Sequence, residues 1–221
     1  MTGVQTCALP IFAKLDEWGL SENTLLCFLG DNGTCQPKLY DGGMRGAKGS
    51  PFQGGTRVGL LARWRGTLAE NAECPALTAH IDLFPTFCAL AGATPPADKR
   101  LDGRSLLPLL LNPKGNWEDR LLFTHVGRWK PGTNPDDAKY KQCAVRTKRF
   151  RFINNAQLYD ILEDPREQHD VASQHPEEVA RLRQAYDAWW AEVRPCMENE
   201  NPVNVPSQNP YKTAYWQQFG Y

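Results

Sequence analysis

The feature that most constrains the fold is a short apolar run, residues 25–29 (Leu-Leu-Cys-Phe-Leu), which lacks the polar alternation of a half-exposed strand. A run of this kind is typical of a strand buried on both faces of a parallel sheet. Before it, residues 12–18 carry apolar side chains at helical spacing, and Gly19 is suited to end that helix. Helix, short turn and buried strand make half of a βαβ unit, so the pattern predicts an α/β fold.

Three glycine-rich segments follow the predicted strand and place polar side chains on tight turns. They are residues 30–33 (Gly-Asp-Asn-Gly), 46–50 (Gly-Ala-Lys-Gly-Ser) and 53–58 (Gln-Gly-Gly-Thr-Arg-Val). Short glycine turns let oxygen ligands and an ammonium group converge without side-chain bulk. Open α/β sheets also place ligands at the carboxyl ends of their strands. The pattern therefore predicts a site for a metal ion and an oxyanion.

Four side chains on these turns are candidates for that site. Asp31 and Asn32 offer a carboxylate and an amide oxygen, which suit a hard divalent cation such as calcium. Lys48 lies between small residues, so its ammonium group can reach a bound anion as a point charge. Arg57 opens a second predicted strand, residues 57–63, and we expect it to anchor the Gly-Gly turn rather than contact substrate. Taken singly, these residues would be read as an ordinary turn and solvated surface charges.

From residue 121 the chain consists of short alternating segments separated by turn residues, a pattern typical of an antiparallel meander. These segments are residues 121–126, 143–147, 150–153 and 157–160. Pro176 and the two glutamates after it mark the start of a helix that Pro195 closes. The apolar positions of that helix are Val179, Leu182, Tyr186, Trp189 and Val193.

The segment between the two regions has its own helix signals. Asp82 is predicted to cap a helix that ends at Gly92, and residues 105–111 are predicted to form a short helix. Residues 199–221, rich in Asn, Gln, Pro and Tyr, are expected to be an irregular tail.

The composition excludes several classes of function. Its 25 basic and 25 acidic residues give no net field that would favour nucleic acid or an anionic membrane. No apolar stretch approaches the roughly 20 residues of a membrane span. The seven cysteines include no C-x-x-C pair, so neither a structural zinc site nor a disulfide scaffold is indicated. The compartment stays open.

Taken in order along the chain, six segments resemble the sulfatase family of the alkaline-phosphatase-like superfamily. They are residues 24–33, 46–57, 80–86, 101–106, 144–147 and 158–168. The resemblance implies the C-terminal part of the sulfatase mixed-sheet fold, followed by a small antiparallel sheet with a C-terminal helix. On this basis we expect four parts: a non-native junction, the end of the catalytic α/β domain, a C-terminal subdomain and a tail. Their bounds are 1–11, 12–120, 121–195 and 196–221.

The resemblance also implies a chemistry, namely hydrolysis of a sulfate monoester by a formylglycine with the help of calcium. It implies that Asp31 and Asn32 are metal ligands and that Lys48 contacts the sulfate group. The formylglycine arises within a C/S-x-P/A-x-R motif, which this sequence lacks; the segment 74–78 ends in Thr where Arg is required. We therefore expect an incomplete calcium site and no turnover by the isolated chain. The substrate of the parent enzyme would be a sulfated small molecule or glycan.

A second group of candidates is His125, Arg128 and Trp129, which follow a predicted strand. Arg and Trp suit a sulfated sugar, although an ordinary loop explains them as well. His80, His169 and His175 are expected to be structural or exposed. Two other functions stay open: a phosphodiesterase or phosphonate monoester hydrolase of the same superfamily, and a non-catalytic module that binds sulfated glycans. A truncated sheet would also expose the apolar flank of residues 25–29 and favour aggregation.

Overall fold

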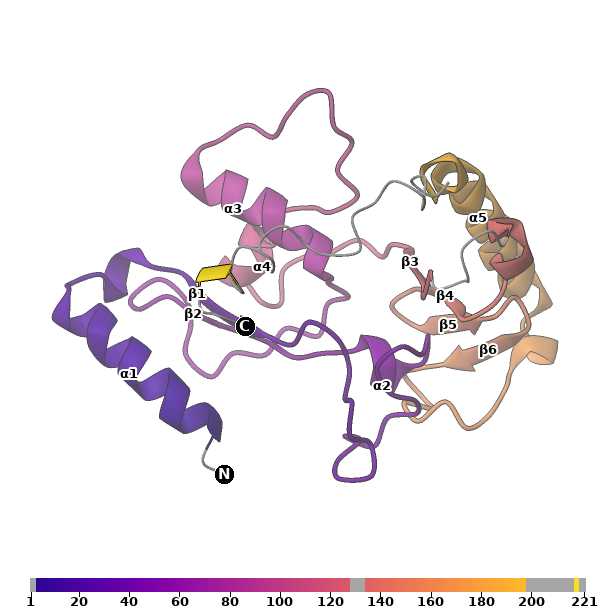
Figure 1. The fold of residues 1–221 in the computed structure, drawn as a ribbon, viewed down its shortest axis with the longest axis horizontal. Coiled ribbons are helices and arrows are strands. Elements are labelled where there is room, and N and C mark those ends of the chain that lie inside the picture. The colour runs from indigo at the N-terminus through magenta and orange to yellow at the C-terminus, as the bar shows by residue number, and fades with distance from the viewer. Residues whose placement is uncertain (1–2, 128–133, 198–216, 219–221) are drawn as a thin grey trace.

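The computed structural model describes residues 3–127, 134–197 and 217–218. The group of elements at the left of Figure 1 comprises α1 (Gly3–Glu17), β1 (Leu26–Leu29), β2 (Leu60–Arg63), α3 (Leu83–Ala91) and α4 (Leu107–Leu111). The group at the right comprises β3 (Leu122–His125), β4 (Cys143–Arg146), β5 (Phe150–Ile153), β6 (Gln157–Asp160) and α5 (Pro176–Val193). The short helix α2 (Gln53–Thr56) lies between the two groups.

The described residues also contain five 3-10 turns: Ser21–Asn23, His80–Asp82, Pro135–Ala138, Ala172–Gln174 and Arg194–Met197. None of the helices in the described part of the chain is both long and apolar enough to cross a bilayer. The predicted irregular tail lies outside the described residues except for positions 217–218.

The first helix confirms the predicted stop signal but starts earlier than expected. Gly19 adopts a left-handed conformation with φ +65°, which lets the N–H of Leu20 bond to the carbonyl of Leu15 at 2.9 Å. This six-to-one bond caps the last turn of α1, as glycine permits at the end of a helix. The helix extends back to Gly3 because the residues before position 12 continue the helical backbone, Pro10 included.

The strand over residues 25–29 is confirmed, but the prediction that it is buried in a parallel sheet is wrong. β1 pairs antiparallel with β2, and in the described part of the chain β2 is its only partner. Phe28 and Leu61 lie opposite each other in this pair and are 57% and 67% exposed. A strand needs a neighbour on each edge and cover on each face to be fully buried, and the described residues give β1 one neighbour.

Phe28 and Leu61 are not the only large apolar side chains exposed in the described part of the chain. Residues that face each other across a strand pair project to the same side, so these two side chains form one apolar ridge. Other large apolar side chains that are 47–49% exposed lie on and next to α3, namely Ile81, Phe84 and Phe87. Apolar surface of this kind is typical of an interface with further polypeptide.

The second group of elements confirms the predicted meander, with strand order β3-β4-β5-β6. One face of this sheet carries Val145, Phe152 and Leu158, which face one another across the strands and are almost completely buried. The helix α5 covers that face with Leu182, Tyr186 and Trp190. Of the apolar positions predicted for this helix, Val179 and Trp189 pack at the edge of the same cluster. Sequence reasoning missed Trp190 because it lies one position off the predicted stripe.

The opposite face of the sheet holds a second, smaller apolar cluster of Ala144, Ile153, Tyr159 and Ile161. Its cover is the loop around Phe52, whose ring meets Tyr159 edge-on with centroids 6.4 Å apart. The sheet thus lies between a helix on one face and the glycine-rich loop of the first group on the other. This arrangement joins the two halves of the chain.

Asp82 stands directly before α3 but does not cap that helix with its side chain, contrary to the prediction. Its carboxylate is fully buried and accepts from Arg120 at 2.7 and 2.5 Å and from the N–H of Arg104 at 3.0 Å. It also accepts from the N–H of Ala79 at 2.8 Å, which caps the preceding 3-10 turn instead. The carboxylate of Asp82 binds the guanidinium group of Arg120 rather than the backbone N–H groups at the start of α3, because a desolvated carboxylate needs a charged partner.

We expect Leu182→Ala to lower the free energy of unfolding by about 2–5 kcal/mol, because it empties a fully buried position between α5 and the sheet. Urea denaturation followed by circular dichroism measures this change. Leu162→Ala is the matched control, since Leu162 is 59% exposed, and it should change stability by less than about 0.5 kcal/mol. Equal effects of the two substitutions would contradict the assigned core.

The apolar ridge on β1 and β2 should make the purified chain self-associate at micromolar concentration. Replacing both Phe28 and Leu61 with Ser is expected to lower the associated fraction in sedimentation velocity, because it removes the apolar pair without touching the core. Leu162→Ser, which changes an exposed leucine outside the ridge, should leave association unchanged. A monodisperse wild-type chain that unfolds cooperatively would disprove this expectation.

Candidate functional site

The three glycine-rich segments identified in the sequence meet at one place, as predicted. Backbone hydrogen bonds join the turn after β1 to the two segments that follow it. They run from Gly33 N–H to Gly55 O (3.0 Å), from Lys48 N–H to Thr34 O (2.8 Å) and from Gly54 N–H to Arg45 O (2.7 Å). Main chain is thus packed directly on main chain, and the positions of the three turns depend on one another.

Only glycine fits at the centre of this packing. A Cβ atom added to Gly33 would lie 1.8 Å from the carbonyl oxygen of Gly54. One added to Gly55 would lie 2.3 Å from the carbonyl oxygen of Ser50, and one added to Gly54 would lie 2.5 Å from that of Gly46. Because the obstructing atoms are backbone, they cannot swing aside as a side chain would. The glycines bring the polar residues of the three segments within one small region.

Asp31 and Asn32 lie at the carboxyl end of β1, where the sequence placed them. Neither side chain forms a hydrogen bond or ion pair with another residue of the described ranges, and Asp31 is exposed. Their oxygens have the chemistry that a hard cation prefers. Two side-chain oxygen ligands do not complete such a site. The described residues contain no cluster of three or more His, Cys, Asp and Glu side chains that could hold a metal. Asp31 and Asn32 could therefore supply two of the oxygen ligands that a hard divalent cation needs.

Sequence reasoning missed a histidine next to these two residues. The Nε2 atom of His80 lies 2.7 Å from the carbonyl oxygen of Gly30, the residue that precedes Asp31. His80 is exposed, as expected, but it ties the end of β1 to the 3-10 turn before α3. No local sequence pattern predicts this contact, because the two partners are 50 positions apart in the chain.

Lys48 has a fixed backbone and an exposed side chain. The turn around it is closed by the bond from Ser50 N–H to Ala47 O at 2.9 Å, and Gly49 takes a left-handed φ of +84°. Within the described ranges the ammonium group has no hydrogen-bond acceptor and no ion-pair partner. A cation held on a rigid turn without an internal partner is suited to meet an external anion.

The prediction that Arg57 anchors the Gly-Gly turn is wrong. Its backbone N–H bonds to Gln53 O at 2.8 Å, but its exposed guanidinium group has no hydrogen bond or ion pair among the residues described. The anchor is Arg151 on β5, whose Nη1 atom donates to the carbonyl of Pro51 at 2.7 Å and to the hydroxyl of Thr56 at 2.8 Å. Sequence distance hid this partner, which lies about a hundred positions further along the chain.

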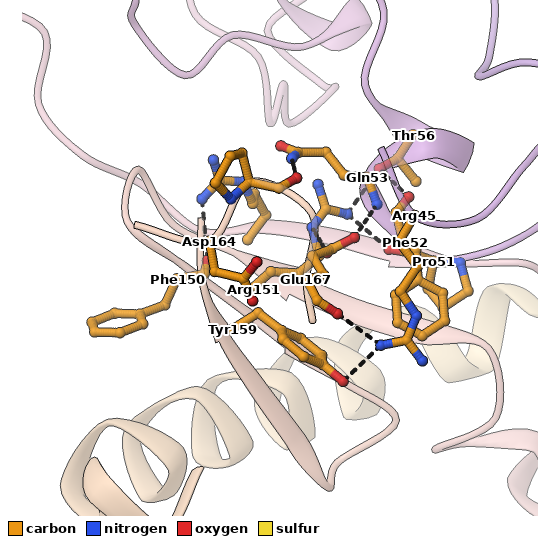
Figure 2. Close-up of polar contacts among 12 residues, drawn as sticks. Arg45, Pro51, Phe52, Gln53, Thr56, Phe150, Arg151, Tyr159, Asp164 and Glu167 are labelled. Atoms are coloured by element: carbon orange, nitrogen blue, oxygen red, sulfur yellow. Dashed lines mark hydrogen bonds and ion pairs between the residues drawn. The ribbon is translucent and has the colours of Figure 1, made fainter. Parts of the chain in front are cut away.

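Arg151 belongs to a buried polar network that holds the loop on the sheet (Figure 2). Its Nε atom lies 3.1 Å from Oε1 of Glu167, a charge contact without the alignment of a hydrogen bond. The other oxygen of Glu167 accepts from the backbone N–H of Gln53 at 2.8 Å, and the side-chain amide of Gln53 donates to Pro165 O at 2.6 Å. Burial lowers the pKa of Arg151 to about 10, which is still well above neutral pH. The guanidinium group is therefore charged at neutral pH and pairs with Glu167.

Arg45 strengthens the same attachment from the edge of the loop. Its Nη1 atom donates to the Tyr159 hydroxyl and to the Glu167 carbonyl, both at 2.9 Å, as Figure 2 shows. The guanidinium group also lies 4.1 Å from the centre of the Phe52 ring, a cation-π contact. Arg45 thereby connects the start of the lysine turn to the C-terminal sheet.

The second group of predicted site residues is placed elsewhere. His125 lies on β3, and its ring packs on Trp190 of α5 with centroids 5.2 Å apart, on the sheet face opposite the Lys48 loop. Its Nδ1 accepts from Gly127 N–H at 2.8 Å, so Nε2 carries the proton that faces Ala138 O at 3.0 Å. Arg128 and Trp129 lie outside the described residues. The structure does not bring His125 together with Lys48.

Comparison with known proteins identifies the family to which the chain is similar. Residues 48–188 match the family described as N-sulphoglucosamine sulphohydrolase, C-terminal. The chain is 30% identical to the steryl-sulfatase of Rattus norvegicus, across 88% of this chain and 40% of the relative. It is 29% identical to an N-acetylgalactosamine-6-O-sulfatase of Bacteroides thetaiotaomicron, across 80% of this chain and 38% of that protein.

The fold agrees as well. The crystal structure of Ps i-CgsB superposes with a TM-score of 0.67 at 23% identity, covering 95% of this chain and 44% of that one. The chain thus spans about 40% of the length of the two curated relatives. The family match covers more than half of the chain, including Lys48 and the sheet beneath its turn. This match shows that the chain belongs to the sulfatase family.

Proposed function

We propose that this chain forms the C-terminal part of a hydrolase that cleaves sulfate monoesters, with Lys48 as a contact to the sulfate group. The observation that carries the proposal is the convergence of three glycine turns on one backbone core, with the Lys48 ammonium and the Asp31 carboxylate left exposed. An anion and a cation could each be bound there without breaking an internal ion pair among the described residues. The sulfatase relatives support the same reading.

In this proposal the chain's residues bind and orient rather than attack. Lys48 places positive charge against the sulfate oxygens, where negative charge grows as the bond to the leaving oxygen breaks. Asp31 and Asn32 supply two oxygen ligands to a calcium ion, which when bound would polarise the sulfate. The 221 residues contain no C/S-x-P/A-x-R motif, so the formylglycine nucleophile comes from sequence outside them.

The substrate class is a sulfate ester of a small molecule or a glycan. The two relatives differ in this respect, since one is named a steryl-sulfatase and the other an N-acetylgalactosamine-6-O-sulfatase. What their names share is the sulfate group, which is the part of the substrate that Lys48 would contact.

The deciding experiment starts with the coding DNA upstream of the Phe12 codon. An in-frame C-x-P-S-R-type motif there, and turnover of an aryl sulfate by the extended protein made in a host that forms formylglycine, would support the proposal. Faster turnover of an aryl phosphodiester or phosphonate would assign the other hydrolase class. No turnover, together with calcium-independent binding of a sulfated glycan, would assign a binding module. Full activity of the 221-residue chain alone would disprove the proposed division of roles between this chain and the sequence that supplies the nucleophile.

In the extended, active enzyme we expect Lys48→Ala to lower kcat/KM for the aryl sulfate by about 100-fold to 1,000-fold, the usual effect of losing one group that stabilises developing negative charge. Lys114→Ala is the matched control, because Lys114 is also exposed and also precedes a glycine. It should leave kcat/KM unchanged. Equal rates for both variants would remove Lys48 from the site.

The isolated 221-residue chain should bind calcium with a Kd weaker than about 1 mM, because Asp31 and Asn32 leave most of the coordination sphere to water. Isothermal titration calorimetry measures this affinity. In the extended enzyme, Asp31→Ala should weaken calcium binding. A micromolar Kd for the isolated chain would show instead that its own residues complete the site.

A further inference from the structure

The buried ion pair formed by Arg151 and Glu167 is an inefficient way to stabilise the fold. The side chains are 5% and 0% exposed, and taking both charges out of water carries a large desolvation cost. Apolar residues of similar volume often stabilise a protein as well as such a pair. The loop already has an apolar contact to the sheet through Phe52 and Tyr159. A role beyond holding the two halves together is therefore indicated.

What the charged pair adds is a fixed position of the loop on the sheet. Apolar packing tolerates small sliding movements, whereas hydrogen bonds to backbone groups fix a segment in one register. Glu167 binds the N–H of Gln53, and Arg151 binds the carbonyl of Pro51 and the hydroxyl of Thr56. Both ends of the short helix α2 are thus held by groups from the C-terminal sheet and the loop that follows it.

A continuous chain of backbone bonds leads from α2 to the lysine turn. Gly54, the residue after Gln53, donates to the carbonyl of Arg45, and Gly55 accepts from Gly33. Lys48 in turn donates to Thr34, the residue after Gly33. A shift of α2 along the sheet would therefore move both the Lys48 turn and the end of the Asp31 turn. Glycine packing without side chains transmits such a shift directly, because no flexible group lies between the segments.

We propose that Glu167 and Arg151 are positioning residues that set the Lys48 turn relative to the Asp31 turn, so that the C-terminal sheet controls the geometry of the anion site. This inference rests on the proposed function for its consequence in catalysis. Its structural content, that the carboxylate of Glu167 fixes the Lys48 turn, stands apart from what that turn binds.

The test is hydrogen exchange read at single amides by NMR, on the 221-residue chain with Phe28 and Leu61 both replaced by Ser, the background expected to lower self-association; each variant below is compared with that background. Glu167→Ala is expected to speed exchange of the Gly33, Lys48 and Gly54 amides by about 10-fold to 100-fold, the usual effect of leaving a buried partner unsatisfied. The amides within β4 and β5 should exchange at the rate of that background. Glu167→Gln, which keeps an oxygen for Gln53 N–H but loses the charge, should give a smaller increase at the same amides and covers the case in which the alanine variant does not fold.

Val179→Ala is the matched control, because it weakens the apolar cluster on the other face of the same sheet. It should leave the ratio of loop to strand exchange unchanged. Unaltered exchange at the three loop amides in both Glu167 variants would overturn the proposal, and so would an equal acceleration in loop and strands. Because no sulfate ester is present, neither outcome depends on whether the sulfatase assignment is correct.

Discussion

The ion pair between Arg151 and Glu167 is the contact on which the arrangement of this chain most depends. It lies between a four-stranded sheet and a loop, and each member binds backbone groups of that loop. The loop carries the glycines that support the turns after β1 and around Lys48. One buried pair thus connects the core of the C-terminal half to the polar residues of the N-terminal half.

The two faces of the C-terminal sheet accordingly differ in composition and in what they contact. The face under α5 is apolar and aromatic, and it supplies most of the buried core. The other face mixes Ala144, Ile153 and Tyr159 with the charged Arg151, because it must receive a loop whose backbone groups need hydrogen-bond partners. A sheet with one dry face and one polar face can both stabilise a fold and orient a neighbouring site.

Sequence patterns predicted the elements whose signals are local. The meander, α5 and its stripe, and the glycine stop at Gly92 follow from period, proline and glycine placement, and the structure has them. The environment of β1 could not be predicted, since an apolar run does not say how many neighbours a strand has. The anchoring role predicted for Arg57 failed because the loop is held instead by Arg151, which lies about a hundred positions further along the chain. Contacts of this range carry no sequence period.

The main-chain packing at Gly33 bears on how natural variants of this protein should be judged. Gly33 is only half-buried, so a ranking by exposure would count Gly33→Ala among the tolerated changes. The added methyl group would meet a carbonyl oxygen at 1.8 Å, and that oxygen belongs to a segment held from behind by the sheet. A missense allele at this position would therefore be classed as damaging on geometry alone, even though the substitution is the smallest that the genetic code allows at a glycine.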